Sequence, residues 1–465
     1  MDGTTEGIKM KTEFLEGEKL IRLWNRLNAL QLLAIGFAVI ILIGAGLLSL
    51  PVANRDGGSI PFVNALFTST SATCVTGLVV YDTYTQFTAF GQVVILMLIQ
   101  IGGLGFMTIA VLVSMILGKR IGLKERSYLK EAVSAFQLGG VVRLSKRILI
   151  VTAAVEGIGA ILLAIRFVPL YGFGQGVWFS VFHSVSAFCN AGFDLFGIIE
   201  PYASLIPFAG DGLVNGTIMG LIVVGGLGFI VWNDMIDNGV RFSKYQLHTR
   251  VILLSTVALV ALSSVILYAV EKDASMAGMD RGTRVLASIF QAVTPRTAGF
   301  NTVDMAALSE PGSAIVMLNM FIGAGPGSTA GGVKISTVVV VVLSLIAYTR
   351  GIDDVNIGRR RLPTGIERRA YCGMMLYVVM ALAGLMVLIS LKDAHLHDAL
   401  FEALSAIGTV GLSKGITRAL SDGSLMILIA LMYAGRVGSL SVAMALTERR
   451  RAGVLKYPVG QILVG

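Results

Sequence analysis

The sequence is poor in charge and in cysteine, and both shortages exclude classes of protein. Only 14% of its 465 residues are charged, whereas 55% are apolar, which is too apolar a balance for a soluble globule of this length. Three cysteines give neither a disulfide framework nor the spacing of a metal site. Apolar runs of about 20 residues, beginning at Leu32, instead predict an all-α polytopic membrane protein.

The net charge of +9 follows membrane topology. Lysine and arginine gather outside the apolar runs, before residue 32 and at 119–147, 238–250, 350–369 and 449–456. Short loops rich in these residues stay in the cytoplasm, so we expect both termini and the three long connections there. The basic balance therefore indicates a lipid membrane and no nucleic-acid partner.

A short glycine-containing segment occurs four times, about 110 residues apart. Each copy follows a similar lead-in, such as Phe67-Thr-Ser-Thr-Ser71. The four copies are Val75-Thr76-Gly77, Asn190-Ala191-Gly192, Thr297-Ala298-Gly299 and Thr409-Val410-Gly411. A single copy is equally well explained as a glycine turn, but four matched copies favour a shared function. Extended backbone around one axis can offer a dehydrated cation a ring of carbonyl oxygens, so we predict a selectivity filter.

Each repeat is predicted to hold an outer helix, a short helix, the filter segment and an inner helix. The short helix has about a dozen residues, too few to cross a bilayer of about 30 Å, so it must be re-entrant. In repeat 2 we expect one inner helix from Gly212 to Ile236, whose Val224-Gly-Gly-Leu-Gly228 motif allows close helix packing. The predicted division is an N-terminal segment 1–31, repeats at 32–118, 148–237, 251–348 and 371–447, and a C-terminal tail 448–465.

The inner segment of repeat 3 needs a further explanation. It runs from Ser313 to Tyr348, about 54 Å as a helix, which exceeds the bilayer. Within it, Gly323–Gly332 contains five glycines and a proline in ten residues, so a regular helix cannot continue. Unwound backbone at membrane depth is tolerated where it is buried in protein or lines water. We predict a flexible gate across a pore, with a static kink as the alternative.

Together these motifs resemble the Trk/Ktr/HKT superfamily of potassium transporters, and most closely the bacterial Ktr-type membrane subunit. The resemblance extends from about Leu32 to Gly465. It is carried by the filter segments, the glycine-rich loop and three short motifs, Pro295-Arg-Thr-Ala-Gly-Phe-Asn301, Gly435-Arg-Val-Gly438 and Lys456-Tyr-Pro. One departure is that repeat 3 is a residue shorter between its lead-in and its glycine.

The resemblance implies four helix-pore-helix units around one K⁺ path, as in K⁺ channels, in a bacterial cytoplasmic membrane. It implies K⁺ ligation by backbone carbonyls at Thr76, Gly77, Asn190, Gly192, Thr297, Gly299, Thr409 and Gly411. It places Arg436 beneath the filter, and the implied gate comprises Gly323, Gly325, Gly327, Ser328, Thr329, Gly331, Gly332, Lys334 and Arg436. Implied partners are a second copy, forming a homodimer, and a cytosolic RCK-type ring that alone would bind nucleotide. Na⁺ permeation, Na⁺/K⁺ cotransport and symport with H⁺ stay open.

Two enzyme alternatives are weaker. Gly411-Leu-Ser413-Lys-Gly415 fits the nucleophile elbow of a serine hydrolase, but that motif needs a preceding strand and a histidine partner. The nearby His395 and His397 precede a predicted re-entrant helix. Gly332-Val-Lys334 differs from a Walker A motif in spacing and follows no strand. We therefore expect no enzyme.

Two charged residues within apolar segments remain. Glu156 lies inside the outer helix of repeat 2, and intramembrane carboxylates are candidates for function by default. We expect it to pair with a group of a re-entrant helix or with Arg296. Lys334 is expected either to belong to the gate or to extend toward the cytoplasmic face.

Overall fold

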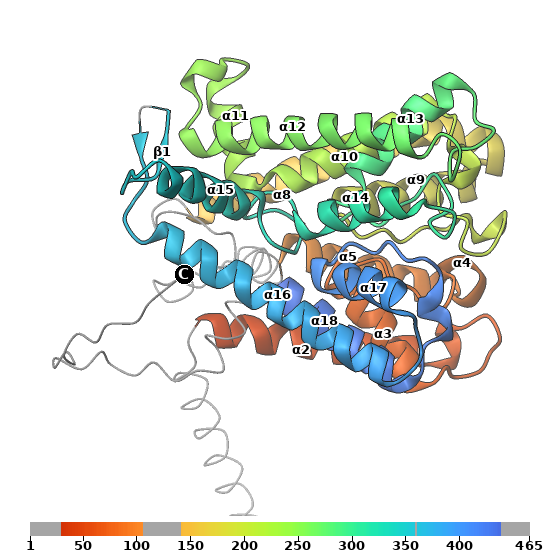
Figure 1. Cartoon of the computed structure of the whole chain (residues 1–465). Helices are drawn as coiled ribbons and strands as arrows, with labels where there is room; N and C mark the ends of the chain where they lie inside the picture. The colour runs from red at the N-terminus through yellow and green to blue at the C-terminus, as the bar shows by residue number, and fades with distance from the viewer. Residues whose placement is uncertain (1–28, 106–140, 359, 439–465) are drawn as a thin grey trace, which may run out of the picture.

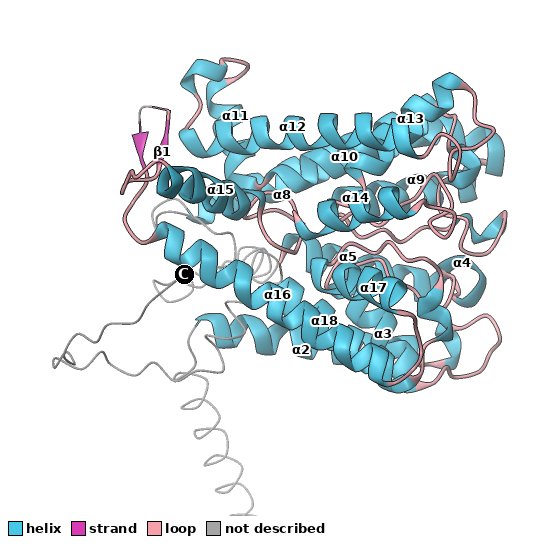
Figure 2. Ribbon diagram, viewed as in Figure 1, coloured by secondary structure: helices cyan, strands magenta, loops and turns pink. Residues whose placement is uncertain are grey.

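The computed structural model describes residues 29–105, 141–358 and 360–438, and most of this described part is helical, joined by loops (Figure 2). Four described helices are long and apolar enough to cross a membrane. They are α2 (Ala29–Leu48), α8 (Val141–Tyr171), α12 (Leu247–Val270) and α16 (Ile366–Ser390). Many of their apolar side chains are exposed, as expected where lipid replaces water. The predicted all-α polytopic class is confirmed.

Each long helix is followed by a shorter one that packs on it, so the same pair occurs four times along the chain (Figure 1). The shorter helices are α3 (Phe62–Thr73), α9 (Phe173–Phe188), α13 (Arg281–Val293) and α17 (Leu396–Gly408). None of these four exceeds 16 residues, or about 24 Å, so none spans a bilayer alone. An extended segment follows each, then an inner helix: α5 (Ala89–Leu104), α10 (Gly212–Leu227), α14 (Glu310–Phe321) and α18 (Asp422–Val437).

Glycines in the outer helices let the short helices approach closely. In repeat 1 the Ser69 hydroxyl donates to the Ile41 carbonyl at 2.7 Å, and in repeat 2 the Ser184 hydroxyl donates to the Glu156 carbonyl at 2.6 Å. A methyl group added to the facing glycine would overlap the serine oxygen in repeat 2. The same contact in two repeats shows that they share their packing as well as their sequence pattern.

The inner helix of repeat 2 corrects one prediction. It is not continuous to Ile236, because α10 ends at Leu227 and α11 (Phe229–Asn238) leaves at an angle of 98°. Gly228, between them, has φ +104°, which glycine adopts without strain. Gly105 and Gly438 have positive φ where α5 and α18 end. The glycine motifs thus end these helices as well as permit packing.

In repeat 3 the inner segment is interrupted as the composition predicted. Helix α14 ends at Phe321 and α15 (Ile335–Thr349) begins after a non-helical stretch. The Gly323 amide donates to the Val333 carbonyl at 2.8 Å, which closes the stretch into a loop. We call residues 322–334 the intramembrane loop.

The remaining elements are short. They are α4 (Thr83–Gln86), the 3-10 turns Pro51–Ala53, Phe196–Ile198, Ile206–Phe208, Phe242–Lys244 and Ile416–Ala419, and the antiparallel strands β1 (Asn356–Ile357) and β2 (Arg360–Arg361). The strands lie at the same end of the molecule as the start of α16 (Figure 1). The predicted N-terminal segment, the C-terminal tail with Lys456, and the end of repeat 1 fall wholly or mainly outside the described residues.

Candidate ion-conduction site

The four glycine segments adopt one local structure. The residue two before each glycine has a left-handed backbone, with φ between +50° and +72°, and each glycine has φ between +70° and +96°. These residues are Val75, Asn190, Thr297 and Thr409, followed by Gly77, Gly192, Gly299 and Gly411. Left-handed conformations are rare outside glycine. Finding them at one position in all four repeats indicates a constraint shared by the four segments.

Lead-in serines and a threonine hold these segments in place. The Ser71 hydroxyl accepts from the Gly77 amide at 3.1 Å, and Ser405 does the same for Gly411 at 3.1 Å. In the other repeats the hydroxyl donates to the carbonyl after the glycine, as Thr294 does to Phe300 at 2.5 Å. The matching lead-ins therefore fasten the end of each re-entrant helix to its own filter segment.

The missing residue of repeat 3 is visible in its hydrogen bonds. In repeat 1 the Thr76 amide donates to the Ser71 carbonyl five residues earlier, at 2.8 Å. In repeat 3 the Ala298 amide donates to the Thr294 carbonyl four residues earlier, at 2.9 Å. The shortened turn still delivers Gly299 to the position of the other glycines.

The glycines meet in a closed ring. A Cβ built on each glycine would strike a carbonyl oxygen of the next repeat, that of the residue just before its glycine. The Cβ–oxygen pairs are Gly77 with Ala191 at 2.6 Å, Gly192 with Ala298 at 2.7 Å, Gly299 with Val410 at 2.8 Å, and Gly411 with Thr76. Each repeat thus touches the next, and repeat 4 returns to repeat 1. Chain segments more than 300 residues apart bring their carbonyls to one axis.

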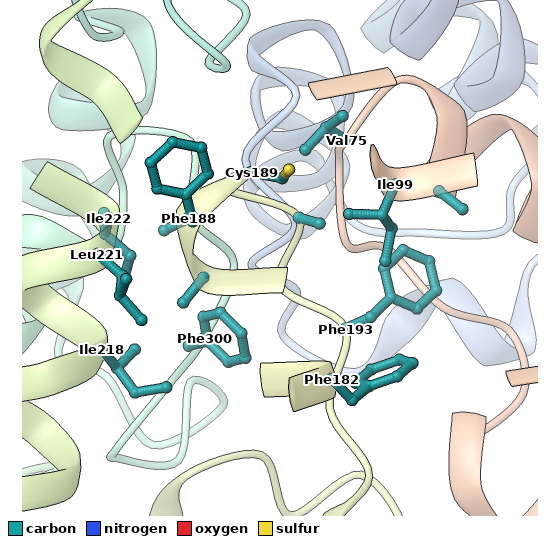
Figure 3. Packing of buried hydrophobic residues seen from close by; sticks show 14 of the residues in the cluster. Val75, Ile99, Phe182, Phe188, Cys189, Phe193, Ile218, Leu221, Ile222 and Phe300 are labelled. Atoms are coloured by element: carbon teal, nitrogen blue, oxygen red, sulfur yellow. The ribbon is translucent and has the colours of Figure 1, made fainter. Parts of the chain in front are cut away.

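Buried apolar side chains pack against the backbone segments that form this ring. Figure 3 shows Phe188, Cys189 and Phe193 of repeat 2 between the α10 residues Ile218, Leu221 and Ile222 on one side and Val75 and Ile99 of repeat 1 on the other. All eight belong to one buried cluster, and none is more than 4% exposed. Tight packing resists changes of volume, so the segments are held at a fixed spacing.

The intramembrane loop contacts one side of the ring. Gly331 packs on the Thr409 side chain and Gly332 on the Gly408 backbone of repeat 4. In repeat 2, the Gly325 amide donates to the Gly226 carbonyl at 2.8 Å. The Thr329 hydroxyl donates to the Phe188 carbonyl at 3.2 Å. The loop therefore lies against two repeats next to their filter segments.

Two cations hold the loop. Arg436 of α18 donates from one guanidinium nitrogen to the Thr329 carbonyl. A second nitrogen donates to the carbonyls of Gly102, at the end of α5, and Gly103, the latter at 3.2 Å. Lys334 donates to the carbonyls of Ala330 and Gly331 at 2.7 and 3.0 Å. The Lys334 ammonium is therefore bound within the loop and does not extend toward the cytoplasmic face, which corrects that alternative. Every predicted gate residue lies in the loop or touches it.

Glu156 has one of its two expected partners. Its carboxylate accepts from the Gln100 amide of α5 at 3.3 Å and lies 3.9 Å from the Cys189 sulfur, at the end of a re-entrant helix. The pairing with Arg296 is wrong, because the buried Arg296 donates to the Thr256 hydroxyl at 3.1 Å. Glu156 thus joins repeats 1 and 2 behind the ring.

A cavity of about 180 Å³ lies on the other side of the ring and was missed at the sequence level. All four filter glycines line it, together with Asp82, Asp194, Asp304, Lys414 and Arg418. Burial, and then the negative charge of Asp82, raises the pKa of Asp194 to about 7. Acidic residues one or two positions beyond a filter segment, such as Asp194, were the available signal.

The serine-hydrolase alternative finds no support in the described residues. Ser413 donates its hydroxyl to Glu402 of α17, not to a histidine. His397 lies instead beside the Lys414 ammonium, at 3.2 Å. No strand precedes the motif in the described part of repeat 4.

Comparisons with known proteins agree with this geometry. A family model described as TrkH, cation transport protein, matches residues 33–450. The chain is 41% identical to the Ktr system potassium uptake protein B of Bacillus subtilis, over 97% of this chain and all of that protein. It is 38% identical to the potassium/sodium uptake protein NtpJ of Enterococcus hirae, over 96% and 99% of the two chains.

A solved structure has the same fold. The potassium transporter TrkH from Vibrio parahaemolyticus superposes with a TM-score of 0.69 at 20% identity, covering 89% of this chain and 85% of that one. None of these matched proteins is named as an enzyme.

Proposed function

Since the chain belongs to the Trk/Ktr family of cation transport proteins, we propose that it takes up K⁺ across the bacterial cytoplasmic membrane. The observation that carries this proposal is the closed ring of four filter glycines, each against the carbonyl of the next repeat. A ring of backbone carbonyls can replace the hydration shell of a K⁺ ion. K⁺ is the substrate here, held in the filter by carbonyls of the segments that end at Gly77, Gly192, Gly299 and Gly411.

We propose that the intramembrane loop is the gate. It lies on the inner side of the ring, where an ion leaving the filter would meet Arg436 and the loop backbone. A fixed positive charge on a cation path raises an electrostatic barrier, and a polar loop adds a steric one. Arg436 holds the loop through hydrogen bonds to backbone carbonyls, which can break and form again without a change of fold.

The partners follow from the same family. We propose a homodimer whose cytoplasmic face binds a cytosolic ring of the RCK type, with nucleotide bound only on that ring. Basic connections between the repeats support the docking of an acidic face, and the relative from Bacillus subtilis is named as part of a Ktr system. Both termini then lie in the cytoplasm.

A second candidate is transport of Na⁺ together with K⁺. It is favoured by the 38% identity to a protein named for potassium and sodium uptake. All four filter positions are glycine in this chain, which favours K⁺ as the main substrate.

Uptake of ⁸⁶Rb⁺ and of ²²Na⁺ in a bacterium lacking its own K⁺ uptake tests the proposal. Cells that express the chain with its matching cytosolic subunit should grow at low K⁺ and take up Rb⁺ well ahead of Na⁺. Equal uptake of the two ions would favour the second candidate. Absence of both growth and flux at normal membrane expression would refute both. Pull-down of the cytosolic subunit at low salt, where charge attraction is strongest, tests the partner separately.

A further inference from the structure

A second cavity, of about 440 Å³, lies beside the intramembrane loop and is unused by the proposed transport mechanism. It lies where three helices begin, with His248 from α12, Ser336 and Thr337 from α15, and Arg369 from α16 on its wall. These helices have 24, 15 and 25 residues. Each helix start presents the positive end of its dipole to the cavity. Three such ends at one cavity favour an anion.

None of these helix starts is satisfied by its own capping side chain. The N-cap residues Gln246, Lys334 and Gly365 accept no amide through a side chain. No carboxylate is among the described residues that line the cavity. Two acids bind backbone amides at these helix starts, Asp234 at the Gln246 amide at 2.9 Å and Glu367 at the Gly365 amide at 3.1 Å. The described wall thus carries the guanidinium of Arg369 and no carboxylate of its own.

An independent observation points to a bound group. Tyr377 of α16 lines the cavity and is 2% exposed, yet its hydroxyl has no hydrogen-bond partner within the described part of the chain. A buried hydroxyl without a partner destabilises the fold, and a ligand oxygen there would supply the missing partner. Arg369, in the first turn of the same helix, is exposed. The same cavity is thus lined by the exposed Arg369 guanidinium and the buried Tyr377 hydroxyl.

We propose that this cavity binds a phosphate group, either in the head group of an anionic lipid or as a free phosphate. Arg369 and the hydroxyls of Ser336 and Thr337 bind the phosphate oxygens at the positive end of the α15 dipole, since a guanidinium and a helix start both favour an anion. Tyr377 donates to a second oxygen deeper in the cavity. Basic pockets between membrane helices on the cytoplasmic side are suited to anionic head groups.

The site would act on the gate, and this step rests on the proposed function. Helix α15 begins directly after the intramembrane loop, and Gly332, Val333 and Lys334 of the loop line the cavity. An occupant that binds the start of α15 fixes one end of the loop. Occupancy then shifts the balance between loop conformations by its different affinity for each.

Binding is tested on the purified full chain by its thermal unfolding, a measurement that does not depend on transport. The additions are dioleoyl-phosphatidylglycerol, inorganic phosphate, and oleate as an anionic amphiphile without phosphorus. Phosphatidylglycerol, phosphate or both should raise the Tm of the wild type, and oleate should not. A rise with phosphatidylglycerol alone assigns a lipid, and a rise with inorganic phosphate assigns a free anion.

Variants place the effect in this cavity. Arg369→Gln should weaken the apparent affinity about tenfold through loss of a charge-assisted hydrogen bond, and Tyr377→Phe should weaken it less without a loss of packing. The matched control is Arg368→Gln, an exposed neighbour on the same turn that does not line the cavity. Equal stabilisation of all four proteins, stabilisation by oleate as well, or no stabilisation by any addition would overturn the proposal. Rb⁺ flux into proteoliposomes, with and without phosphatidylglycerol, then measures the effect on the gate.

Discussion

The ring of filter glycines and the intramembrane loop are both irregular backbone at the centre of the molecule, but different interactions hold them in place. The ring is held by steric fit, because its glycines leave no room for a methyl group beside the next carbonyl, and apolar side chains pack behind it. The loop also fits closely, since a Cβ on Gly325 or Gly331 would strike Leu227 or Thr409. It is held in addition by hydrogen bonds from Arg436 and Lys334 to its carbonyls. Steric fit fixes one geometry, whereas such bonds can exchange partners.

This difference explains why one region is repeated and the other is not. Selectivity needs equivalent oxygens around an axis, so every repeat contributes the same segment. A gate needs two states, and one mobile segment can supply them. Among the described parts of the inner segments, that of repeat 3 alone is interrupted by a long loop, with 13 residues between α14 and α15. The other three described inner helices end or bend at one glycine.

The largest effect is expected from a side chain in the ring. Gly77→Ser would place its Cβ 2.6 Å from the Ala191 carbonyl and 3.2 Å from the Gly192 Cα, at φ +96°. The neighbouring carbonyls must move, so the uptake ratio of Rb⁺ to Na⁺ should fall at least about tenfold, or ~1.4 kcal/mol. The matched control is Gly216→Ser in α10, where a Cβ meets nothing within 4 Å. An unchanged ratio in the well-expressed variant would count against the filter.

Next in size is release of the loop. Arg436→Ala removes bonds to Thr329 and to the end of α5, each charge-assisted and worth about 1.5–3 kcal/mol. Initial Rb⁺ uptake per membrane protein should rise roughly three- to tenfold with selectivity kept, and dependence on the cytosolic subunit should weaken. Deletion of Gly325–Gly332 should act in the same direction. The control is Arg350→Ala, an exposed arginine after α15. Reduced flux at normal expression in both gate variants would show a static kink.

The repeated region was the more predictable of the two. Composition, the four glycines and their lead-ins sufficed for the helical class and for the four segments whose glycines meet in the ring, because copies within one chain can be compared with one another. That these segments select K⁺ stays a prediction. The loop was found as a break, since five glycines and a proline in ten residues exclude a helix. Residue patterns alone could not connect Arg436 with Thr329, which are 107 residues apart in sequence; only the family resemblance placed both at the gate.

Predictions failed for features that depend on contacts between residues far apart in the sequence. Glu156 contacts Gln100, 56 residues earlier, and no local pattern connects them. The bend at Gly228 was missed because Gly-Gly-Leu-Gly also suits close helix packing, and only the loop against α10 shows why the helix turns there. The cavity of about 180 Å³ on the side of the ring away from the loop, here called the outer cavity, was missed because its wall comes from all four repeats.

A smaller effect on the gate is expected from Lys334. Within the described residues its ammonium bonds to Ala330 and Gly331 alone, inside the loop, whereas Arg436 connects the loop with α18 and α5. Lys334→Met should therefore raise Rb⁺ uptake about twofold, less than Arg436→Ala, because only a local restraint is lost. Lys334→Arg, which keeps the charge, is the control. A rise as large as that of Arg436→Ala would mean that charge, not bridging, sets the barrier.

The smallest expected effect is a pH dependence of uptake that arises in the outer cavity, where the charge of Asp194 acts on the ion at a distance. Burial and the charge of Asp82 raise the pKa of Asp194 to about 7, so Asp194 changes from mostly ionised to mostly protonated as the external pH falls from 8 to 6. An ionised carboxylate beside the filter entrance raises the local K⁺ concentration. Uptake by the wild type should therefore fall about twofold over this range, a small change because salt screens the open side of the cavity.

Asp194→Asn separates this effect from the others. The variant cannot ionise, so its uptake should be low at pH 8 and nearly flat down to pH 6, with the ion ratio and the dependence on the cytosolic subunit unchanged. A raised carboxyl pKa also means that folding disfavours the ionised form, so this group costs stability as pH rises through 7. The Tm of Asp194→Asn should accordingly exceed that of the wild type at pH 8 and converge with it at pH 6. Asp304→Asn, which changes an exposed carboxylate of the same cavity, should keep the wild-type pH dependence. If it loses that dependence while Asp194→Asn retains it, the proton acts elsewhere in the cavity.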